Sequence, residues 1–188
     1  MKSPGISSKI PLIEELKSLQ IPLVSEIEFA SKFTDAVLIG ITGSNGKTTT
    51  AMLTHHILKT AGFDVGLVGN IGNSFAKDVA ENDHEYYVLE ISSFQLDDII
   101  NFAPKIGVIT NITPDHLDRY DNDFSKYLKS KLRINQNQTQ RDFLLFNADD
   151  PELNKAIKQI DTLATIHGFG YNSFDTNTTY LELSLIHI

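Results

Sequence analysis

The sequence has 188 residues, 41% hydrophobic and 21% charged, which are ordinary values for a globular domain and argue against wholesale disorder. The formal net charge of −8 disfavours a nucleic-acid-binding protein, because such proteins present a basic surface. The absence of cysteine excludes disulfides and thiol catalysis, and no apolar run approaches the roughly 20 residues of a membrane span. We therefore expect a soluble cytoplasmic protein without a nucleic-acid or membrane partner.

The first part of the chain predicts only short helices. Residues 12–20 have apolar side chains at helical spacing. Ser25 is a candidate N-cap for a second helix that reaches about Phe33. Glu28, three residues after Ser25, completes the pattern of a capping box, in which two side chains cap each other's backbone N–H groups. This stretch is too short to be a domain, so we interpret it as the end of a preceding domain or as a linker.

From residue 36 the pattern changes to short apolar runs that alternate with helical segments. The run 36–41 is continuously apolar, as in a strand buried on both faces. Helices are predicted at about 47–60, closed by Gly62, at 123–135 and from Pro151. Further strands are predicted at 65–68, 86–91, 106–110, 143–146 and 163–167. This alternation predicts an α/β fold with a doubly wound, mostly parallel sheet, which binds ligands at the carboxyl ends of its strands.

The segment after the first predicted strand has the strand–loop–helix context of a phosphate-binding P-loop. Glycines let backbone N–H groups turn toward phosphate oxygens, and a helix N-terminus adds partial positive charge. Lys47 is expected to reach the outer phosphates, and the Thr48 hydroxyl to ligate magnesium. The general pattern has a further glycine where this chain has Ile41, which leaves a glycine-rich turn with a surface lysine as the alternative. The segment reads Thr42-Gly43-Ser44-Asn45-Gly46-Lys47-Thr48.

Three further residues are candidates for chemistry. Glu90 is a carboxylate at the end of an apolar strand, so it is either a magnesium ligand beside Thr48 or a strand-end side chain facing solvent. His116 follows the fourth strand; a lone loop histidine is usually structural, but the neighbouring phosphate chemistry favours a metal ligand or a substrate contact. For Lys131, nothing in the local pattern distinguishes a functional residue from a solvated charge on a helix.

Four segments together resemble the Mur ligases of peptidoglycan synthesis: residues 42–48, Gly69-Asn70-Ile71-Gly72, Leu-Glu-Ile-Ser-Ser-Phe-Gln-Leu at 89–96, and Asn-Ile-Thr-Pro-Asp-His-Leu-Asp-Arg at 111–119. The missing P-loop glycine is itself a trait of that family. Three segments are most similar to the branch that adds D-glutamate to UDP-N-acetylmuramoyl-L-alanine: Ser3-Pro4-Gly5-Ile6, Gly69-Asn70-Ile71-Gly72 and Ser-Ser-Phe-Gln-Leu at 92–96. The resemblance covers residues 3 to about 170. Residues 172–188 resemble nothing recognised, which leaves a truncation artefact open as their origin.

The resemblance implies a division of the chain and a set of roles. Residues 1–25 would be the remnant of a UDP-binding N-terminal domain, and residues 26–188 an incomplete central ATP-binding domain. Lys47, His116 and Lys131 would be catalytic. The ATP phosphates would be held by Gly43, Ser44, Asn45, Gly46, Lys47, Thr48 and Thr49. Magnesium would be held by Thr48, Glu90, His116 and a carbamate on Lys131, and the muramoyl substrate by Gly5, Asn70, Ser92, Gln95 and His116, with Gly5 near the diphosphate.

The family's reaction also follows from the resemblance. The carboxylate of UDP-N-acetylmuramoyl-L-alanine would attack the γ-phosphorus of ATP, and the amine of D-glutamate would then displace phosphate from the acyl phosphate. ATP, two magnesium ions, a monomeric state and the bacterial cytoplasm are implied. The fragment alone is expected to have negligible ligase activity. Two alternatives remain: another P-loop enzyme such as a small-molecule kinase, and a nucleotide-dependent switch without chemistry.

Overall fold

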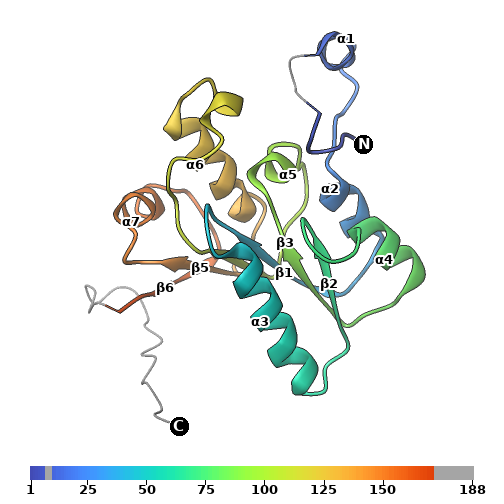
Figure 1. Ribbon diagram of the computed structural model, residues 1–188, viewed down its shortest axis with the longest axis vertical. Coiled ribbons are helices and arrows are strands. Elements are labelled where there is room, and N and C mark those ends of the chain that lie inside the picture. The colour runs from blue at the N-terminus through green and yellow to red at the C-terminus, as the bar shows by residue number, and fades with distance from the viewer. Residues whose placement is uncertain (7–9, 172–188) are drawn as a thin grey trace.

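Within residues 1–6 and 10–171, which the computed structural model describes, six strands form one entirely parallel sheet (Figure 1). The strand order is β2-β3-β1-β4-β5-β6. This confirms the predicted doubly wound α/β fold. The strands are β1 (Val37–Thr42), β2 (Val65–Gly69), β3 (Tyr86–Glu90), β4 (Ile106–Ile109), β5 (Phe143–Asn147) and β6 (Thr165–Phe169).

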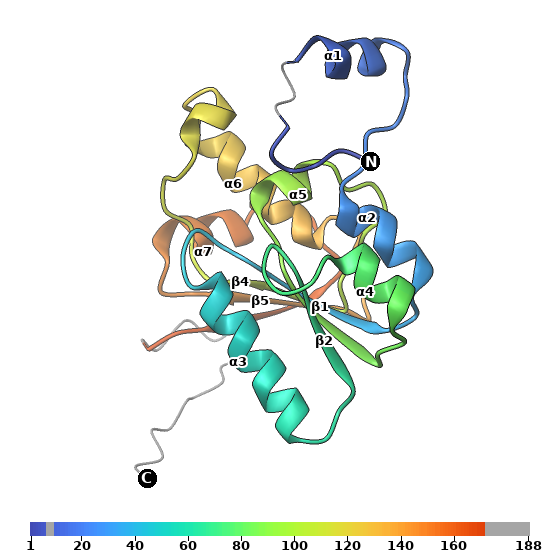
Figure 2. The ribbon, with the colours of Figure 1, turned by 45° about the vertical axis from the view of Figure 1, so that its right-hand side comes forward.

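Helices cover both faces of the sheet. The helix α3 lies against one face, whereas α2, α4, α5, α6 and α7 lie on the other side (Figures 1 and 2). In the described part of the chain, no helix combines the length and apolar character needed to cross a bilayer. The α-helices are α1 (Pro11–Ser18), α2 (Glu26–Ala30), α3 (Lys47–Thr60), α4 (Phe75–Glu81), α5 (Ser93–Asp97), α6 (Phe124–Leu132) and α7 (Pro151–Ile157). Three-residue or four-residue 3-10 helices are η1 (Ser31–Phe33), η2 (Leu117–Tyr120) and η3 (Arg133–Asn135).

Strand side chains alternate between two buried cores. Ile39 and Ile41 of β1 pack with Ala51 of α3 on one face. Leu38, which precedes Ile39 and lies on the opposite face, packs in the larger core, which includes Phe75 of α4. Both faces of β1 are therefore buried, which explains the continuously apolar run in the sequence. The position where the general P-loop pattern has glycine is thus a core position of the strand.

The order of the strands places a crevice at the carboxyl end of β1. This strand pairs with β3 on one side and with β4 on the other. The connection through α3 leads toward β2, whereas the chain crosses from β3 over to β4, so the direction of winding reverses at β1. Ligands of open α/β sheets bind at such a reversal. The phosphate loop and the segments after β3 and β4 all start at this edge.

The predicted capping box at the start of α2 is only half correct. The Ser25 side chain accepts the Glu28 N–H, as predicted. The Glu28 carboxylate does not return to the Ser25 N–H, which instead donates to the Asp98 carbonyl. Glu28 Oε2 accepts N–H groups from Ile100, Asn101 and Phe102 at 2.8–2.9 Å, because three convergent donors outweigh one. The reciprocal capping box lies at the start of α5, a helix that the sequence analysis did not predict.

Candidate active site

A cavity of about 320 Å³ opens at the carboxyl edge of the sheet. Residues from the N-terminal segment, the phosphate loop, α6 and the segments after β2, β3 and β4 line it. It brings together many of the residues singled out in the sequence, namely Gly5, Lys47, Asn70, Ser92, His116 and Lys131. Its other lining residues are Pro4, Ser93, Phe94, Asp115, Arg119 and Tyr127.

The phosphate loop ends in an uncapped helix N-terminus. Gly46 is the N-cap of α3 with φ of +79°, a backbone conformation that favours glycine, and no side chain caps the helix. Within the described residues, no hydrogen bond to the N–H groups of residues 46–49 is found. The Lys47 ammonium donates to the carbonyls of Gly43 and Ser44, both at 2.9 Å. The end of the loop therefore presents free donors and a cation, which suit an anion such as phosphate.

The start of the loop is clamped to the segment that follows β4. The Ser44 N–H donates to the Asn111 carbonyl, and the Asn45 N–H to Asn111 Oδ1. Asn111 Nδ2 in turn donates to the Asn45 carbonyl at 2.9 Å. Gly43 approaches Thr110 so closely that a Cβ would overlap its hydroxyl. The amides of Ser44 and Asn45, expected to face phosphate, are thus engaged within the protein, and residues 46–49 carry the free donors.

Glu90 is a buried carboxylate held by neutral donors. Its side chain is 2% exposed, which rejects the alternative of a strand end facing solvent. It accepts the Thr48 hydroxyl at 2.7 Å and the Asn70 amide at 2.8 Å. In the described ranges, no cation pairs with Glu90 and no group of three or more His, Cys, Asp or Glu side chains gathers to hold a metal. Two oxygens beside a phosphate site fit magnesium, which takes few protein ligands and completes its shell with phosphate and water.

Lys131 is buried, contrary to the reading of a solvated helix charge. Its side chain is 2% exposed on the inward side of α6. Burial is the largest cause that lowers its pKa, repulsion from Lys47 adds to it, and Asp115 and Asp97 oppose it; the result is a pKa of about 7. No hydrogen bond or ion pair to its Nζ occurs among the described residues. A substantial fraction of this amine is therefore neutral and nucleophilic at neutral pH.

His116 also lines the cavity. Its backbone is left-handed, with φ of +47°, and the residue is the N-cap of η2. Its Nε2 is 3.5 Å from an Asp115 carboxylate oxygen, and its ring centroid is 5.6 Å from that of Phe94. The side chain is 58% exposed, so it is accessible to a bound molecule.

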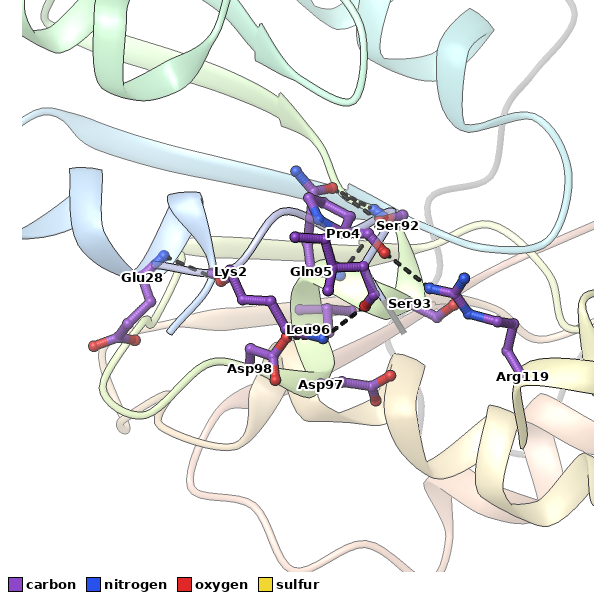
Figure 3. Close-up of polar contacts among 12 residues, drawn as sticks. Lys2, Pro4, Glu28, Ser92, Ser93, Gln95, Leu96, Asp97, Asp98 and Arg119 are labelled. Atoms are coloured by element: carbon purple, nitrogen blue, oxygen red, sulfur yellow. Dashed lines mark hydrogen bonds and ion pairs between the residues drawn. The ribbon is translucent and has the colours of Figure 1, made fainter. Parts of the chain in front are cut away.

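The N-terminal segment closes one side of the cavity. Figure 3 shows Arg119 pointing toward Pro4, whose carbonyl accepts its guanidinium at 2.9 Å. Lys2 forms a 2.9 Å ion pair with Asp98 (Figure 3). These contacts hold Gly5, the residue expected near the diphosphate, at the cavity wall.

Residues 41–185 match the family described as the Mur ligase middle domain. The chain belongs to the Mur ligase family. The match reaches beyond residue 171, so most of the segment 172–188, which showed no resemblance in the sequence analysis, falls inside the family's extent. That segment lies outside the described residues.

Two curated relatives of this Mur ligase chain carry the same name. A Bacteroides fragilis protein named UDP-N-acetylmuramoylalanine–D-glutamate ligase is 50% identical over 182 residues, which cover 97% of this chain and 41% of the relative. A Porphyromonas gingivalis protein of the same name is 46% identical over 179 residues, covering 95% of this chain and 40% of the relative. The chain thus spans well under half the length of these relatives.

Two solved structures share the fold. The MurF ligase from Thermotoga maritima, in complex with ADP, superposes with a TM-score of 0.60 at 21% identity, covering 77% of this chain and 36% of that one. FolC from E. coli, in complex with DHPP and ADP, gives a TM-score of 0.59 at 16% identity, covering 90% and 55%. At these identities the likeness concerns the fold alone.

Two residues of this Mur ligase domain depart from the sequence analysis. Gln95 was expected to contact substrate, but its side chain is 2% exposed, its Oε1 accepts the Ser92 N–H and hydroxyl in the capping box of α5 (Figure 3), and it does not line the cavity. For Lys131 a signal was present: Phe124, Tyr127 and Ile134 are spaced so that Lys131 falls on their apolar stripe.

Proposed function

We propose that this chain is part of a longer ATP-dependent ligase that joins D-glutamate to UDP-N-acetylmuramoyl-L-alanine in the bacterial cytoplasm, as a monomer. The observation that carries the proposal is the gathering of Lys47, His116 and Lys131 in one cavity, beside the buried Thr48–Glu90 pair. The names of the relatives at 46–50% identity support D-glutamate as the acceptor.

In this proposal the protein holds MgATP at the start of α3. The N–H groups of residues 46–49 and the Lys47 ammonium bind the phosphates. Thr48 and Glu90 hold one magnesium ion, whose charge neutralises the phosphate oxygens when it is bound. His116 and a carbamate on Lys131 hold a second ion or contact the substrate.

The proposed reaction uses no nucleophile from the protein, so the main contribution of the protein is to position the substrates. Asn70, Ser92 and Gly5 orient the muramoyl substrate so that its terminal carboxylate meets the γ-phosphorus in line. Lys47 stabilises the charge of the transferred phosphoryl group. ADP leaves as the acyl phosphate forms. The D-glutamate amine then attacks the acyl carbon, and the amide forms as phosphate leaves and the amine loses a proton.

Phosphate release by the full-length parent protein tests the assignment. With a panel of L- and D-amino acids, we expect release to require both UDP-N-acetylmuramoyl-L-alanine and D-glutamate, because the acyl phosphate turns over only with the correct amine. A coupled phosphate assay with amide detection by chromatography measures this. Release with neither cosubstrate, or a stable phosphorylated product without amide, would indicate a different P-loop enzyme such as a kinase.

The carbamate on Lys131 has a separate test. A neutral buried amine reacts with carbon dioxide, and the lowered pKa of about 7 makes the neutral form abundant. Crystals grown with bicarbonate and magnesium are expected to show density for a carboxylated lysine at residue 131. A Lys131→Met variant, similar in length but unable to react, is the matched control. An unmodified amine at full occupancy in saturating bicarbonate would refute the carbamate.

A further inference from the structure

Tyr127 of α6 lies between the phosphate loop and Lys131. Its side chain is 1% exposed, yet it contributes to the wall of the cavity. Its hydroxyl is 2.9 Å from Ser44 Oγ, and the Lys131 Nζ lies 4.8 Å from the centre of its ring. One side chain thus touches both the loop that would hold phosphate and the buried amine.

The direction of the hydrogen bond between Tyr127 and Ser44 follows from counting protons. A serine hydroxyl has one proton to donate and two lone pairs to accept. Ser44 donates to the Thr113 carbonyl at 2.8 Å and accepts the Thr113 N–H at 2.9 Å. The remaining lone pair faces Tyr127, so the tyrosine must be the donor. The Ser44 hydroxyl therefore makes all of its possible hydrogen bonds within the protein, and these bonds connect the phosphate loop to α6.

The ring of Tyr127 supports Lys131. The two residues are one helical turn apart, so their side chains lie on the same side of α6. Because the amine has no hydrogen bond or ion pair among the described residues, the ring face is the contact that orients it. Tyr120 packs edge-on against the same ring, with centroids 5.5 Å apart, and Phe124 lies at 6.4 Å. The Tyr127 ring is therefore held in place by neighbouring aromatic rings and forms a rigid surface for the Lys131 side chain.

We propose that Tyr127 is a positioning residue that sets the spacing between the phosphate loop and Lys131. Its hydroxyl holds the loop through Ser44, and its ring holds the lysine side chain. The proposal rests on the proposed function for the role of Lys131 in turnover, whereas the link to the loop concerns nucleotide binding alone. Loss of the hydroxyl should therefore act on nucleotide affinity, and loss of the ring on turnover.

A double-mutant cycle on the full-length parent protein tests the link to the loop. Tyr127→Phe is expected to raise the dissociation constant for MgATP about five-fold, the equivalent of one hydrogen bond. Ser44→Ala is expected to raise it as well. Because the hydroxyl acts through Ser44, adding Tyr127→Phe to Ser44→Ala should cause no further rise. Isothermal titration calorimetry with MgATP measures all four proteins, and additive effects would overturn the proposal.

Tyr120→Phe is the matched control. Tyr120 is a neighbouring buried tyrosine whose hydroxyl bonds to Asp97 and Ser130 rather than to the loop. It should leave MgATP affinity unchanged, and an effect equal to that of Tyr127→Phe would reduce the role of Tyr127 to general packing. Thermal unfolding of each variant checks that the fold is retained.

Measurement of kcat tests the role of the Tyr127 ring. Tyr127→Leu should lower kcat about 30-fold below that of Tyr127→Phe, because the Lys131 side chain loses the ring that fixes its position. Equal kcat values for the two variants would refute this part; if Tyr127→Leu does not fold, the MgATP cycle decides alone. Absence of D-glutamate-dependent turnover in the unmodified protein would refute the proposed function, while the MgATP cycle would still report on Tyr127.

Discussion

Lys47→Ala in the full-length parent protein is expected to lower kcat/KM for the ligase reaction about 1,000-fold. The Lys47 ammonium is the cation at the start of α3, and it now rests on the carbonyls of Gly43 and Ser44, from which it can turn to a phosphate. A preorganised donor aimed at the transferred group typically contributes two to three orders of magnitude, or about 100- to 1,000-fold. Steady-state phosphate release measures the loss.

Lys59→Ala provides the control for this experiment. Lys59 is an exposed lysine in the last turn of the same helix, far along α3 from the phosphate loop. Its removal changes the net charge equally but should leave kcat/KM unaltered. If Lys47→Ala retained most of the activity, the loop would not be the phosphate site and the proposed function would fail.

Glu28→Ala is expected to lower the free energy of unfolding by about 3–5 kcal/mol, the range for removing one partner of a buried charged contact. The Glu28 carboxylate is fully buried and accepts the N–H groups of Ile100, Asn101 and Phe102. Alanine would leave these donors without a partner and break the link between α2 and the segment before β4. Urea denaturation, monitored by circular dichroism, measures the change.

Two further variants serve as comparisons for the stability loss of Glu28→Ala. Glu28→Gln keeps an acceptor oxygen and should cost less than alanine. Glu81→Ala removes an exposed glutamate, 60% accessible at the end of α4, and should change stability by less than about 0.5 kcal/mol. Equal stability of Glu28→Ala and Glu81→Ala would show that the three N–H groups find other partners.

The same carboxylate makes stability depend on pH in a defined direction. Burial alone would raise the pKa of Glu28, but the N–H groups of Ile100, Phe102 and Asn101, with Lys32, outweigh it and hold the pKa below the ordinary value of 4.5. A lowered pKa in the folded state stabilises the protein above the unfolded value. This contribution is lost as the pH falls through the folded value. The stability of Glu28→Ala should accordingly fall less steeply in acid.

The sequence predicted the helices and strands better than it predicted the hydrogen-bond partners of individual residues. The buried run of β1 and the phosphate loop were readable because strand burial and the Gly-Lys-Thr junction are local patterns. The partners of Glu28 were not, because the three N–H groups come from a segment 72–74 residues away. For the same reason the sequence could not predict the hydrogen bonds between the phosphate loop and Asn111. These bonds determine which backbone N–H groups of the loop remain free to bind phosphate. The burial of Lys131, which is the largest cause of its lowered pKa, could be inferred from the helical spacing. The additional repulsion from Lys47 could not, because Lys47 lies far away in the sequence.

The strand order also constrains how this chain is made on the ribosome. The first two strands to emerge, β1 and β2, are not neighbours, because β3 lies between them. No ladder of the sheet can therefore form until residues 86–90 have left the exit tunnel and inserted between the waiting strands. Until then two apolar segments stay unpaired in the nascent chain, where exposed strand edges favour aggregation. Folding of this domain should therefore begin late in its synthesis, and holdase chaperones should bind it chiefly before that point.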